Sequence, residues 1–391
     1  NSAMDNLGTP VGVTTDITGA TRSTTTPDIG AYEFAPVGCV NPPVPGTVTT
    51  TQSPVCTGTT FTLGFTGGSI GAGLTYQWQR NTGSGWTDIA GATNTTLSLT
   101  QSVTTSYRIT VSCNGNTAVP SAPLDVITPP GMAGNYTINS GVATGGTNFQ
   151  SFNDANSALR CGISAAVVID VVAATGPYNE QLIMDEIPGA SSVNTVTFRG
   201  NGNTLAFAAP TSADRAVIRL NGTDHVTIQD LTIVAGTSSA TYGWGIHLTN
   251  SADSNTIRNC TINVEVTSTT AANSAGIAIS NSATSPTTTG DANCDGNTID
   301  NNTITGGYYG MTMVANSGSA FNSWNKITRN KIRDYYIYGL YVNGAFDVLI
   351  DSNLFERPAR AGVSTHYGIY LTGISASAKI YRNTIRNPFA A

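Results

Sequence analysis

Six acidic residues in the second half of the chain are the first candidates for chemistry. They are Asp295, Asp300, Asp334, Asp347, Asp351 and Glu356. Two carboxyl groups about 5 to 9 Å apart can hydrolyse a glycosidic bond, one as acid and the other as nucleophile or base. Asp300 and Asp351 occupy equivalent places in a repeat, but the intervening copy has Thr328, and no Asp-x-Asp cluster or accompanying Lys or Arg supports a pair. We therefore predict a solvated face and no catalytic residue, with the Asp300/Asp351 region as the alternative.

The three histidines do not form a recognisable site. His225, His247 and His366 stand in different sequence contexts, with neither a metal-ligand spacing nor a Ser/His/Asp order. His247 has the outward position of its strand, which predicts an exposed side chain. The glycines recur with the repeat and form no phosphate-binding loop, so we expect no metal site and no cofactor.

Tyrosines are the best candidates for ligand binding. In a series of apolar-x-apolar segments the middle residue points outward, and the last two of these residues are Tyr341 and Tyr370. Tyr335 and Tyr336 lie nearby in sequence. A row of exposed tyrosines on a flat β-surface suits glycan stacking or partner docking. The alternative is that they lie under a loop or against a neighbouring module. By parity, the tyrosines that precede each Gly (Tyr309, Tyr338 and Tyr367) should face inward or fill a corner.

The polar residue that recurs most regularly is an asparagine in the pattern Ile-x-x-Asn-x-Ile. Its copies contain Asn302, Asn330, Asn353 and Asn383, and two earlier copies have Leu231 and Cys260 in its place. The first Ile recurs at intervals of 29, 42, 28, 23 and 30 residues. We predict a structural corner ladder: each Asn near the left-handed conformation, with side chains that hydrogen-bond from coil to coil.

Repetition at this period indicates a solenoid whose pieces are too short for helix pairs. A strand, a polar corner and another strand in each repeat describe one coil of a parallel β-helix. Composition agrees, because only 10% of the 391 residues are charged and Gly, Thr, Ser and Asn are abundant. The net charge of −6, without a basic stripe, argues against nucleic acid. No apolar run approaches the ~18 residues of a membrane helix, so we expect no membrane insertion.

Residues 37–129 have a different character, with short alternating segments between clusters of turn residues. Five or more such strands predict a β-sandwich. Trp78 suits the buried Trp of an immunoglobulin-like strand C, and Tyr107 the corner before strand F. The segment 76–89, with Trp86-Thr87-Asp88-Ile89, resembles the immunoglobulin-like modules of large surface proteins of the Bacteroidetes type.

Six cysteines without a Cys-x-x-Cys spacing fit an oxidising, extracytoplasmic compartment. In an immunoglobulin-like sandwich, Cys39 and Cys113 should lie at the same end, while Cys56 lies a strand length away. We predict a Cys39–Cys113 bond, which leaves Cys56 to pair with Cys161 at the domain junction. Any pairing between Cys260 and Cys294 depends on the loop at 281–294.

The two ends of the chain carry a second resemblance. Residues 1–36 end in Pro27-Asp28-Ile29-Gly30-Ala31-Tyr32-Glu33, which resembles the closing coil of bacterial pectate-lyase-like β-helix domains. Residues 130–391 resemble secreted β-helix domains of that superfamily, with a capping segment at about 149–160 and no closing motif after the last repeat. Either the chain is a window on a longer array, or residues 1–36 complete the open end of a neighbouring chain by strand donation.

These observations predict an all-β protein with a right-handed parallel β-helix and an immunoglobulin-like spacer. We expect a secreted cell-surface module, an adhesin, stalk or filament that is not an enzyme. Its expected partners are neighbouring modules, identical chains or surface glycan. One alternative is a β-helix polysaccharide lyase or glycoside hydrolase. Another is a glycan-binding module that uses Tyr341 and Tyr370.

Overall fold

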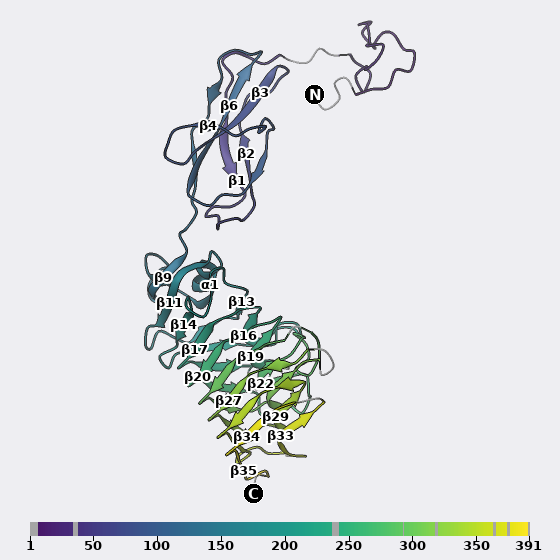
Figure 1. Ribbon diagram of the computed structural model, residues 1–391. Helices are drawn as coiled ribbons and strands as arrows, with labels where there is room; N and C mark the ends of the chain where they lie inside the picture. Colours follow the sequence, from purple (N-terminus) through teal and green to yellow (C-terminus); the bar gives the residue numbers. More distant parts are fainter. Residues whose placement is uncertain are drawn as a thin grey trace. The chain divides into compact units, whose positions relative to one another are not determined.

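The computed structural model describes residues 7–33, 38–236, 242–291, 293–316, 320–362, 365–373 and 376–389. The chain divides into two compact units, residues 1–129 and 130–391 (Figure 1). The separation of residues 1–36 from 37–129, and strand donation by residues 1–36, remain predictions. Among the described residues, no helix is long and apolar enough to cross a membrane.

The segment 7–33 is organised by one carboxylate. Asp16 accepts hydrogen bonds from the N–H groups of Thr18, Ala20 and Glu33 at 2.8, 2.8 and 3.0 Å. The Glu33 carboxylate in turn accepts from the N–H groups of Ser23 and Asp28. The backbone hydrogen bond from Glu33, followed by the other bonds, lowers the pKa of Asp16 to about 2.

The rest of the first unit consists of two antiparallel sheets around one core. One sheet has the order β1-β2-β5, and the other has the order β4-β3-β6-β7, with β8 also paired to β6. The strands are β1 (Thr47–Thr50), β2 (Phe61–Thr66), β3 (Leu74–Asn81), β4 (Thr87–Asp88), β5 (Leu97–Leu99), β6 (Thr105–Cys113), β7 (Val119–Pro120) and β8 (Leu124–Val126). Trp78 and Tyr107 are buried in the shared core, as predicted. Membership of the immunoglobulin-like class remains a prediction.

One predicted disulfide bond is present, between Cys39 and Cys113, whose Cα atoms are 5.8 Å apart. Cys56 and Cys161 are not free thiols either, and their mutual pairing remains a prediction. Cys260 and Cys294 are free and buried. Disulfide bonds persist in oxidising compartments, which indicates an extracellular or secreted protein.

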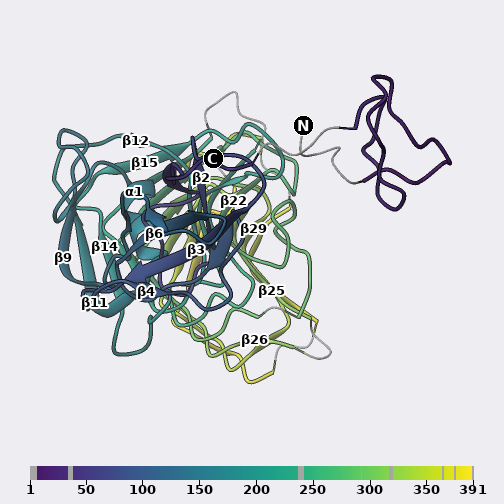
Figure 2. The ribbon, with the colours of Figure 1, turned by 90° about the horizontal axis from the view of Figure 1, so that it is seen from above.

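The second unit is a solenoid of three parallel sheets. Sheet 1 has the order β10 (Asn148–Phe149), β9 (Met132–Ile138), β11 (Ile163–Val171), β14 (Val196–Arg199), β17 (Val226–Gln229), β20 (Thr256–Arg258), β23 (Thr298–Asp300), β27 (Lys326–Thr328), β31 (Leu349–Asp351), β34 (Lys379–Tyr381). Sheet 2 has the order β12 (Tyr178–Asn179), β15 (Thr204–Phe207), β18 (Thr232–Ala235), β21 (Thr261–Val264), β24 (Thr303–Thr305), β28 (Lys331–Arg333), β32 (Leu354–Glu356), β35 (Thr384–Arg386). Sheet 3 has the order β13 (Leu182–Met184), β16 (Ala216–Asn221), β19 (Gly243–Thr249), β22 (Ser274–Ile279), β25 (Tyr309–Val314), β29 (Tyr338–Asn343), β33 (Tyr367–Thr372). Each coil visits the sheets in this order, and the sheets lie on three sides of the solenoid (Figure 2).

The predicted helix α1 (Phe152–Leu159) packs against β9 and β13 at the start of the solenoid. Its N-cap is Ser151, whose hydroxyl accepts a hydrogen bond from the N–H of Asp154 at 3.0 Å. The carboxylate of Glu180 accepts from the N–H groups of Phe152 and Asn153 at 2.9 and 3.0 Å. The free N–H groups of the first turn are thereby satisfied by the first coil.

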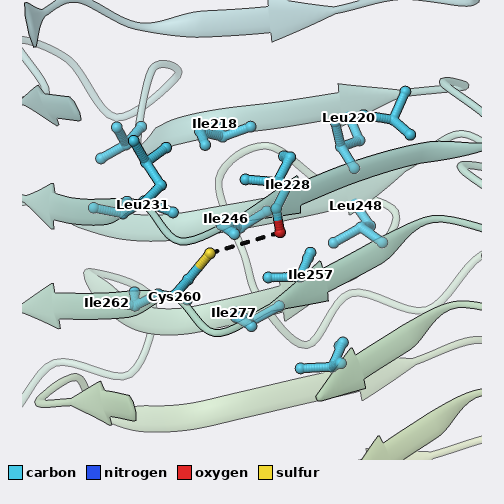
Figure 3. Packing of buried hydrophobic residues seen from close by; sticks show 14 of the residues in the cluster. Ile218, Leu220, Ile228, Leu231, Ile246, Leu248, Ile257, Cys260, Ile262 and Ile277 are labelled. Atoms are coloured by element: carbon cyan, nitrogen blue, oxygen red, sulfur yellow. Dashed lines mark hydrogen bonds between the residues drawn. The ribbon is translucent and has the colours of Figure 1, made fainter. Parts of the chain in front are cut away.

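The isoleucines of the repeat stack in register along the core. In sheet 1, Ile228 pairs with Ile257 and Ile257 with Ile299, and in sheet 2, Ile233 pairs with Ile262. All are at most 1% exposed. Figure 3 shows Ile228, Ile257 and Ile262 in this packing. Cys260, between the two sheets, is also buried, and its thiol lies 3.6 Å from the carbonyl oxygen of Ile228. Burial raises the pKa of this thiol to about 12, so it acts as a small apolar residue.

A column of glycines in sheet 3 sets the direction of the neighbouring side chains. A Cβ atom on Gly310 would lie 2.3 Å from a methyl carbon of Ile332, and on Gly339 it would lie 2.5 Å from the ring of Phe355. The glycine therefore faces inward, and so does the apolar residue that follows it. Two successive inward positions break the alternation of the strand, so the residue before each glycine lies outside.

The corner between sheets 1 and 2, which we name the Arg corner, contains the predicted Asn ladder. Asn302, Asn330 and Asn353 are at most 1% exposed. The N–H groups of Asn302 and Asn330 each donate to the side-chain oxygen of the Asn in the next coil, at 3.0 and 2.9 Å. Asn383 continues the ladder by accepting from Asn353 at 2.9 Å. The predicted coil-to-coil bonds are confirmed.

The predicted left-handed conformation is wrong by one residue. The positive φ angles belong to the preceding positions, with values of 53° at Asn301, 57° at Arg329 and 58° at Ser352. The physical reason is the tight turn, which points one residue outward in the left-handed region and the next, the ladder Asn, into the core. Polar burial is allowed there because both ends of the amide are hydrogen-bonded.

Candidate functional site

Three of the carboxylates predicted from the sequence are neutralised by ion pairs, two of them at the Arg corner and the third, Glu356, on sheet 2. Asp300 accepts from Thr328 at 2.6 Å and from Arg329 at 2.9 Å, and Asp351 accepts from Arg382 at 2.9 Å. Glu356 forms ion pairs with two further arginines, Arg333 and Arg386, at 2.8 Å each. The absence of a basic partner, predicted from the sequence, is therefore wrong. Each partner comes from a neighbouring coil, which local spacing does not reveal.

These contacts make Asp300 and Asp351 poor proton donors. Burial alone would raise the pKa of Asp300, but hydrogen bonds from Arg329 and Thr328 outweigh it and hold the pKa below its usual value. The hydrogen bond from Arg382 does the same for the pKa of Asp351. Both carboxylates therefore stay ionised, and their oxygen atoms are engaged in hydrogen bonds with arginine side chains.

Asp334 and Asp347 also have local partners. Asp334 is 8% exposed and accepts a hydrogen bond from the N–H of Ala359 at 2.8 Å. Asp347 forms an ion pair with Lys379 at 2.5 Å. Of the six carboxylates predicted from the sequence, Asp295 alone lies in the row of carboxylates described below.

Two placements predicted from strand parity or proximity in sequence are wrong. Tyr335 is fully buried rather than exposed, because its ring fills core space beside Gly339, and its hydroxyl lies 2.6 Å from Nε2 of His366. His247 is also fully buried, because the segment after β22 covers it, with the Ser280 carbonyl oxygen 3.1 Å from its Nε2. Burial lowers the pKa of His247 to about 4, so the imidazole is neutral.

The remaining tyrosines form two stacked columns on the outer face of sheet 3. Tyr341 and Tyr370 stack at 5.4 Å, and Tyr338 stacks with Tyr309 at 5.2 Å and with Tyr367 at 5.1 Å. The second column faces outward, contrary to the parity prediction, because the glycine beside each of these tyrosines takes the inward position. Ring faces are thus occupied by neighbouring rings, which leaves edges and hydroxyl groups toward solvent. Glycan binding by Tyr341 and Tyr370 remains a prediction.

Tyr336 lies apart from those two columns. Its ring packs against Tyr308 at 5.4 Å, and the guanidinium of Arg360 lies 4.9 Å from its centroid. Arg360 is 3% exposed and donates to the carbonyl oxygen of Ser268 at 2.8 Å. Tyr336 therefore belongs to a set of packed loops, and its predicted ligand-binding role is untested.

The corner between sheets 3 and 1, which we name the Asp corner, carries an uncompensated row of carboxylates. The N–H of Asp253 donates to the carboxylate of Asp224 at 2.7 Å, and the N–H of Asp295 donates to that of Asp253 at 2.7 Å. Asp295 accepts from the N–H of Ser323 at 2.6 Å. Within the described part of the chain, no ion pair with Lys or Arg involves these three carboxylates.

The electrostatics of this row differ from those of a solvated surface. Burial raises the pKa of Asp253 to about 6, and the negative charges of Asp224 and Asp295 add to the effect. The hydrogen bond from the backbone of Asp295 and the charge of His225 act in the opposite direction. Burial also raises the pKa of Asp295. A carboxyl group with a pKa near 6 can hold a proton and release it near neutral pH.

Two exposed aromatic side chains continue the row. Trp324 directly follows Ser323 and is 56% exposed, and Phe346 in the next coil is 38% exposed. Their rings meet edge to face at 6.4 Å. They are brought together by the pairing of two short strands, β26 (Asn322–Ser323) with β30 (Ala345–Phe346). The Asp corner therefore places proton-transfer groups and an apolar surface on consecutive coils.

Sequence reasoning missed Asp224, Asp253 and Trp324, although a signal was present. Asp253-Ser254-Asn255 and Asp295-Gly296-Asn297 each end two residues before the first Ile of a repeat. Trp324 has the middle position of the third copy, Ser323-Trp324-Asn325. Among the described residues, no group of three or more His, Cys, Asp or Glu side chains could hold a metal ion.

Comparison with known families gives the hand of the solenoid. Residues 216–388 match the family model described as a right-handed β-helix region, and residues 44–129 match a domain of unknown function. The solenoid is thus a right-handed parallel β-helix. No curated protein matches the chain.

Three solved structures are similar, at low identity. One is a “putative glycosyl hydrolase” from Parabacteroides merdae, with 13% identity, a TM-score of 0.28 and coverage of 64% of this chain and 97% of that one. Another is a family 28 exopolygalacturonase from Yersinia enterocolitica, with 11% identity, a TM-score of 0.29 and coverage of 88% and 86%. The third is the catalytic domain of a GH87 α-1,3-glucanase, with 11% identity, a TM-score of 0.17 and coverage of 86% and 99%.

These neighbours contradict the prediction that the chain is not an enzyme, because all three are described as polysaccharide-cleaving or glycosyl-hydrolysing proteins. We correct that prediction and consider an enzymatic function in its place. At such low similarity, the choice of chemistry has to come from the residues of the Asp corner themselves.

Proposed function

We propose that the chain is a secreted glycoside hydrolase whose catalytic groups are the carboxylates of the Asp corner. The observation that carries this proposal is Asp253, whose pKa is raised to about 6 by burial and by the flanking Asp224 and Asp295. A glycosidase needs one carboxyl group that is still protonated near neutral pH beside another that is ionised. Asp300 and Asp351 lack that property.

The spacing of the row favours hydrolysis with retention. Strands of adjacent coils lie about 4.8 Å apart. Carboxyl groups one coil apart therefore match the ~5 to 5.5 Å separation of retaining enzymes better than the wider separation of inverting ones. Asp253 has such a neighbour on each side, Asp224 and Asp295.

The two roles follow from the surroundings of each group. Asp253 donates its proton to the glycosidic oxygen while the carboxylate of Asp224 attacks the anomeric carbon, so that the C–O bond breaks and a glycosyl ester forms. Asp253, now ionised, takes a proton from water, which attacks the same carbon and frees Asp224. Asp295 is the weaker choice of nucleophile, because burial raises its pKa and disfavours its anion.

A polysaccharide lyase is a poorer match to the row. Elimination from a uronate requires a group that removes a proton beside a carboxylate, and cations that stabilise the developing charge. Within the described residues, Asp224, Asp253 and Asp295 have no Lys or Arg paired with them. A carboxyl-only row suits acid–base hydrolysis.

The test is release of reducing ends from a panel of neutral, amino-sugar and uronate polysaccharides. We expect Asp253→Asn and Asp224→Asn each to lower the rate by about 10² to 10⁴, because Asn keeps the hydrogen-bond acceptor of the row and removes only the ionisable group. Asp300→Asn, at the Arg corner, is the matched control and should retain activity.

Circular dichroism and unfolding midpoints check that both variants fold. No hydrolysis of any member of the panel, or equal activity of Asp253→Asn and the parent, would overturn the proposal. The anomeric configuration of the first product, measured by NMR, tests the role of Asp224, since inversion would contradict a covalent intermediate.

A further inference from the structure

Trp324 is held outward at the Asp corner by an unfavourable backbone conformation. Its φ angle is 54°, in the left-handed region that large side chains rarely adopt. Trp78 and Trp244, by contrast, are fully buried. The other members of its column at the Asp corner also have positive φ, but they are small (Ser254, Gly296 and Ser377) or polar (His225 and Asp347), so Trp324 is the large apolar exception among the described residues. A large aromatic residue at such a position exposes its indole and gains little packing.

Trp324 and Phe346 continue the carboxylate row without a break. The N–H of Gly296, next to Asp295, donates to the carbonyl oxygen of Ser323 at 2.8 Å, and the N–H of Trp324 donates to that of Phe346 at 3.0 Å. Each step is one coil along the axis. A polymer that lies along the axis over the row would therefore reach Trp324 two coils beyond Asp253.

The charge of the Asp corner decides which polymer can lie there. Asp224, Asp253 and Asp295 repel anions at short range, and the nearby Lys379 is already paired with Asp347. The chain as a whole carries a net charge of −6, so long-range attraction of a polyanion is also absent. Uncharged sugars avoid this repulsion, and the apolar faces of their rings match an exposed indole.

We propose that the substrate is a polysaccharide of uncharged sugars, not a polyuronate, and that one of its rings stacks on the surface formed by Trp324 and Phe346. This inference rests on the proposed hydrolase function, because it assumes that the chain of sugars lies along the carboxylate row. It assigns Trp324 to substrate binding and gives a reason for its strained backbone.

Calorimetric titration of the full chain carrying Asp253→Asn tests the inference, because that variant binds without turnover. The probes are cellohexaose, mannohexaose and N-acetylchitohexaose, with hexagalacturonate as the anionic counterpart. We expect at least one neutral hexamer to bind and hexagalacturonate to bind at least tenfold more weakly. Adding Trp324→Ala should weaken neutral binding by about tenfold, the equivalent of one lost aromatic stacking contact. Phe346→Ala should weaken it less.

Trp86→Phe is the matched control, since Trp86 belongs to the first unit and packs under Arg108. Three results would overturn the inference. Hexagalacturonate could bind as tightly as the best neutral hexamer, Trp324→Ala could leave the affinity for the neutral hexamer unchanged, or no neutral hexamer could bind. Hydrolysis of polygalacturonate alone would leave the hydrolase proposal standing and reject the neutral substrate. If a neutral hexamer binds but the parent protein hydrolyses no polysaccharide, the neutral ligand stands and the hydrolase proposal is rejected.

Discussion

The Arg corner and the Asp corner, two of the three corners of a coil, are built alike and differ in the charges that they carry. At both, a residue with positive φ is followed by a buried Asn that bonds to the next coil: Arg329 and Asn330 at the Arg corner, and Ser254 and Asn255 at the Asp corner. The carboxylates of the Arg corner are paired with arginines, whereas Asp224, Asp253 and Asp295 of the Asp corner are flanked by one another.

The difference shows how a repeat fold separates stability from chemistry. Buried amides join successive coils at both corners over part of the solenoid, from Asn255 to Asn325 at the Asp corner and from Asn302 to Asn353 at the Arg corner. The outward residues of these coils are therefore free to vary. At the Arg corner they add ion pairs, which lower the pKa values of Asp300 and Asp351. At the Asp corner the outward residues include three carboxylates on consecutive coils. Their mutual repulsion costs stability and helps to raise the pKa of Asp253.

The largest expected effect is the loss of a ladder amide, at either corner. In Asn330→Ala, the N–H of Asn302 and the carbonyl oxygen of Ile299 lose the hydrogen bond to Asn330, and the side-chain NH₂ of Asn302 loses one of its two acceptors. Asn297→Ala removes the acceptor of the Asn255 N–H and the donor to Ala252. We expect each to lower the free energy of unfolding by about 3 kcal/mol, because buried polar groups are left unsatisfied. Urea denaturation measures it.

Asn301→Gly is the control, because Asn301 is exposed, has positive φ and tolerates glycine. It should change the unfolding free energy by less than about 0.5 kcal/mol. A much smaller loss in Asn297→Ala than in Asn330→Ala would show that the corners are not equivalent in construction.

The Arg corner could be largely predicted from sequence, since its repeat is marked by two apolar residues and an Asn. The ladder residues Asn302 and Asn330 were identified, and their burial and bonds confirm the role. The left-handed position was predicted one residue too late. Arg329 and Ser352 adopt the positive φ, although Arg and Ser are not residue types that favour this conformation. Steric rules name the residues that prefer this region, not those that are forced into it.

The Asp corner was not predictable to the same degree. Asp253 and Asp295 are 42 residues apart, and their proximity depends on the length of the loop between them. The raised pKa of Asp253 results from burial and from nearby negative charges. Neither can be predicted from the residues adjacent to it in sequence. The outward turn of Tyr309 was missed for a related reason: the close approach of Ile332 to Gly310 breaks the alternation on which the prediction relied.

The second expected effect is a pH dependence of stability with opposite signs at the two corners. Because the pKa of Asp253 is raised to about 6 in the fold, the folded state binds more protons than the unfolded state between about pH 4 and 6. Stability should therefore fall as pH rises through that window, by about 1 kcal/mol once solvent screening of this partly exposed group is allowed for. Thermal unfolding from pH 4 to 7 measures it.

Asp253→Asn should reduce this slope and leave the part that comes from Asp295, whose pKa is also raised, and Asp300→Asn should leave the slope unchanged. The pKa of Asp300 is lowered, so its contribution is present above its unfolded pKa and is lost only under more acidic conditions. Hydrolysis should follow the same group, with a loss of rate as pH rises through about 6, since Asp253 then lacks its proton. An alkaline limb that survives Asp253→Asn would assign the titration to another residue.

The smallest expected effect concerns the left-handed residue itself. Ser254 is exposed at φ 57°, and Gly296 occupies the same place in the next coil. Ser254→Gly should raise the free energy of unfolding by about 0.5 to 1 kcal/mol, because glycine adopts this conformation without strain. Arg329→Gly relaxes the backbone in the same way but loses the pair with Asp300, so its gain should be smaller. Equal gains in urea denaturation would mean that the arginines contribute nothing to the Arg corner, and that the corners differ in chemistry alone.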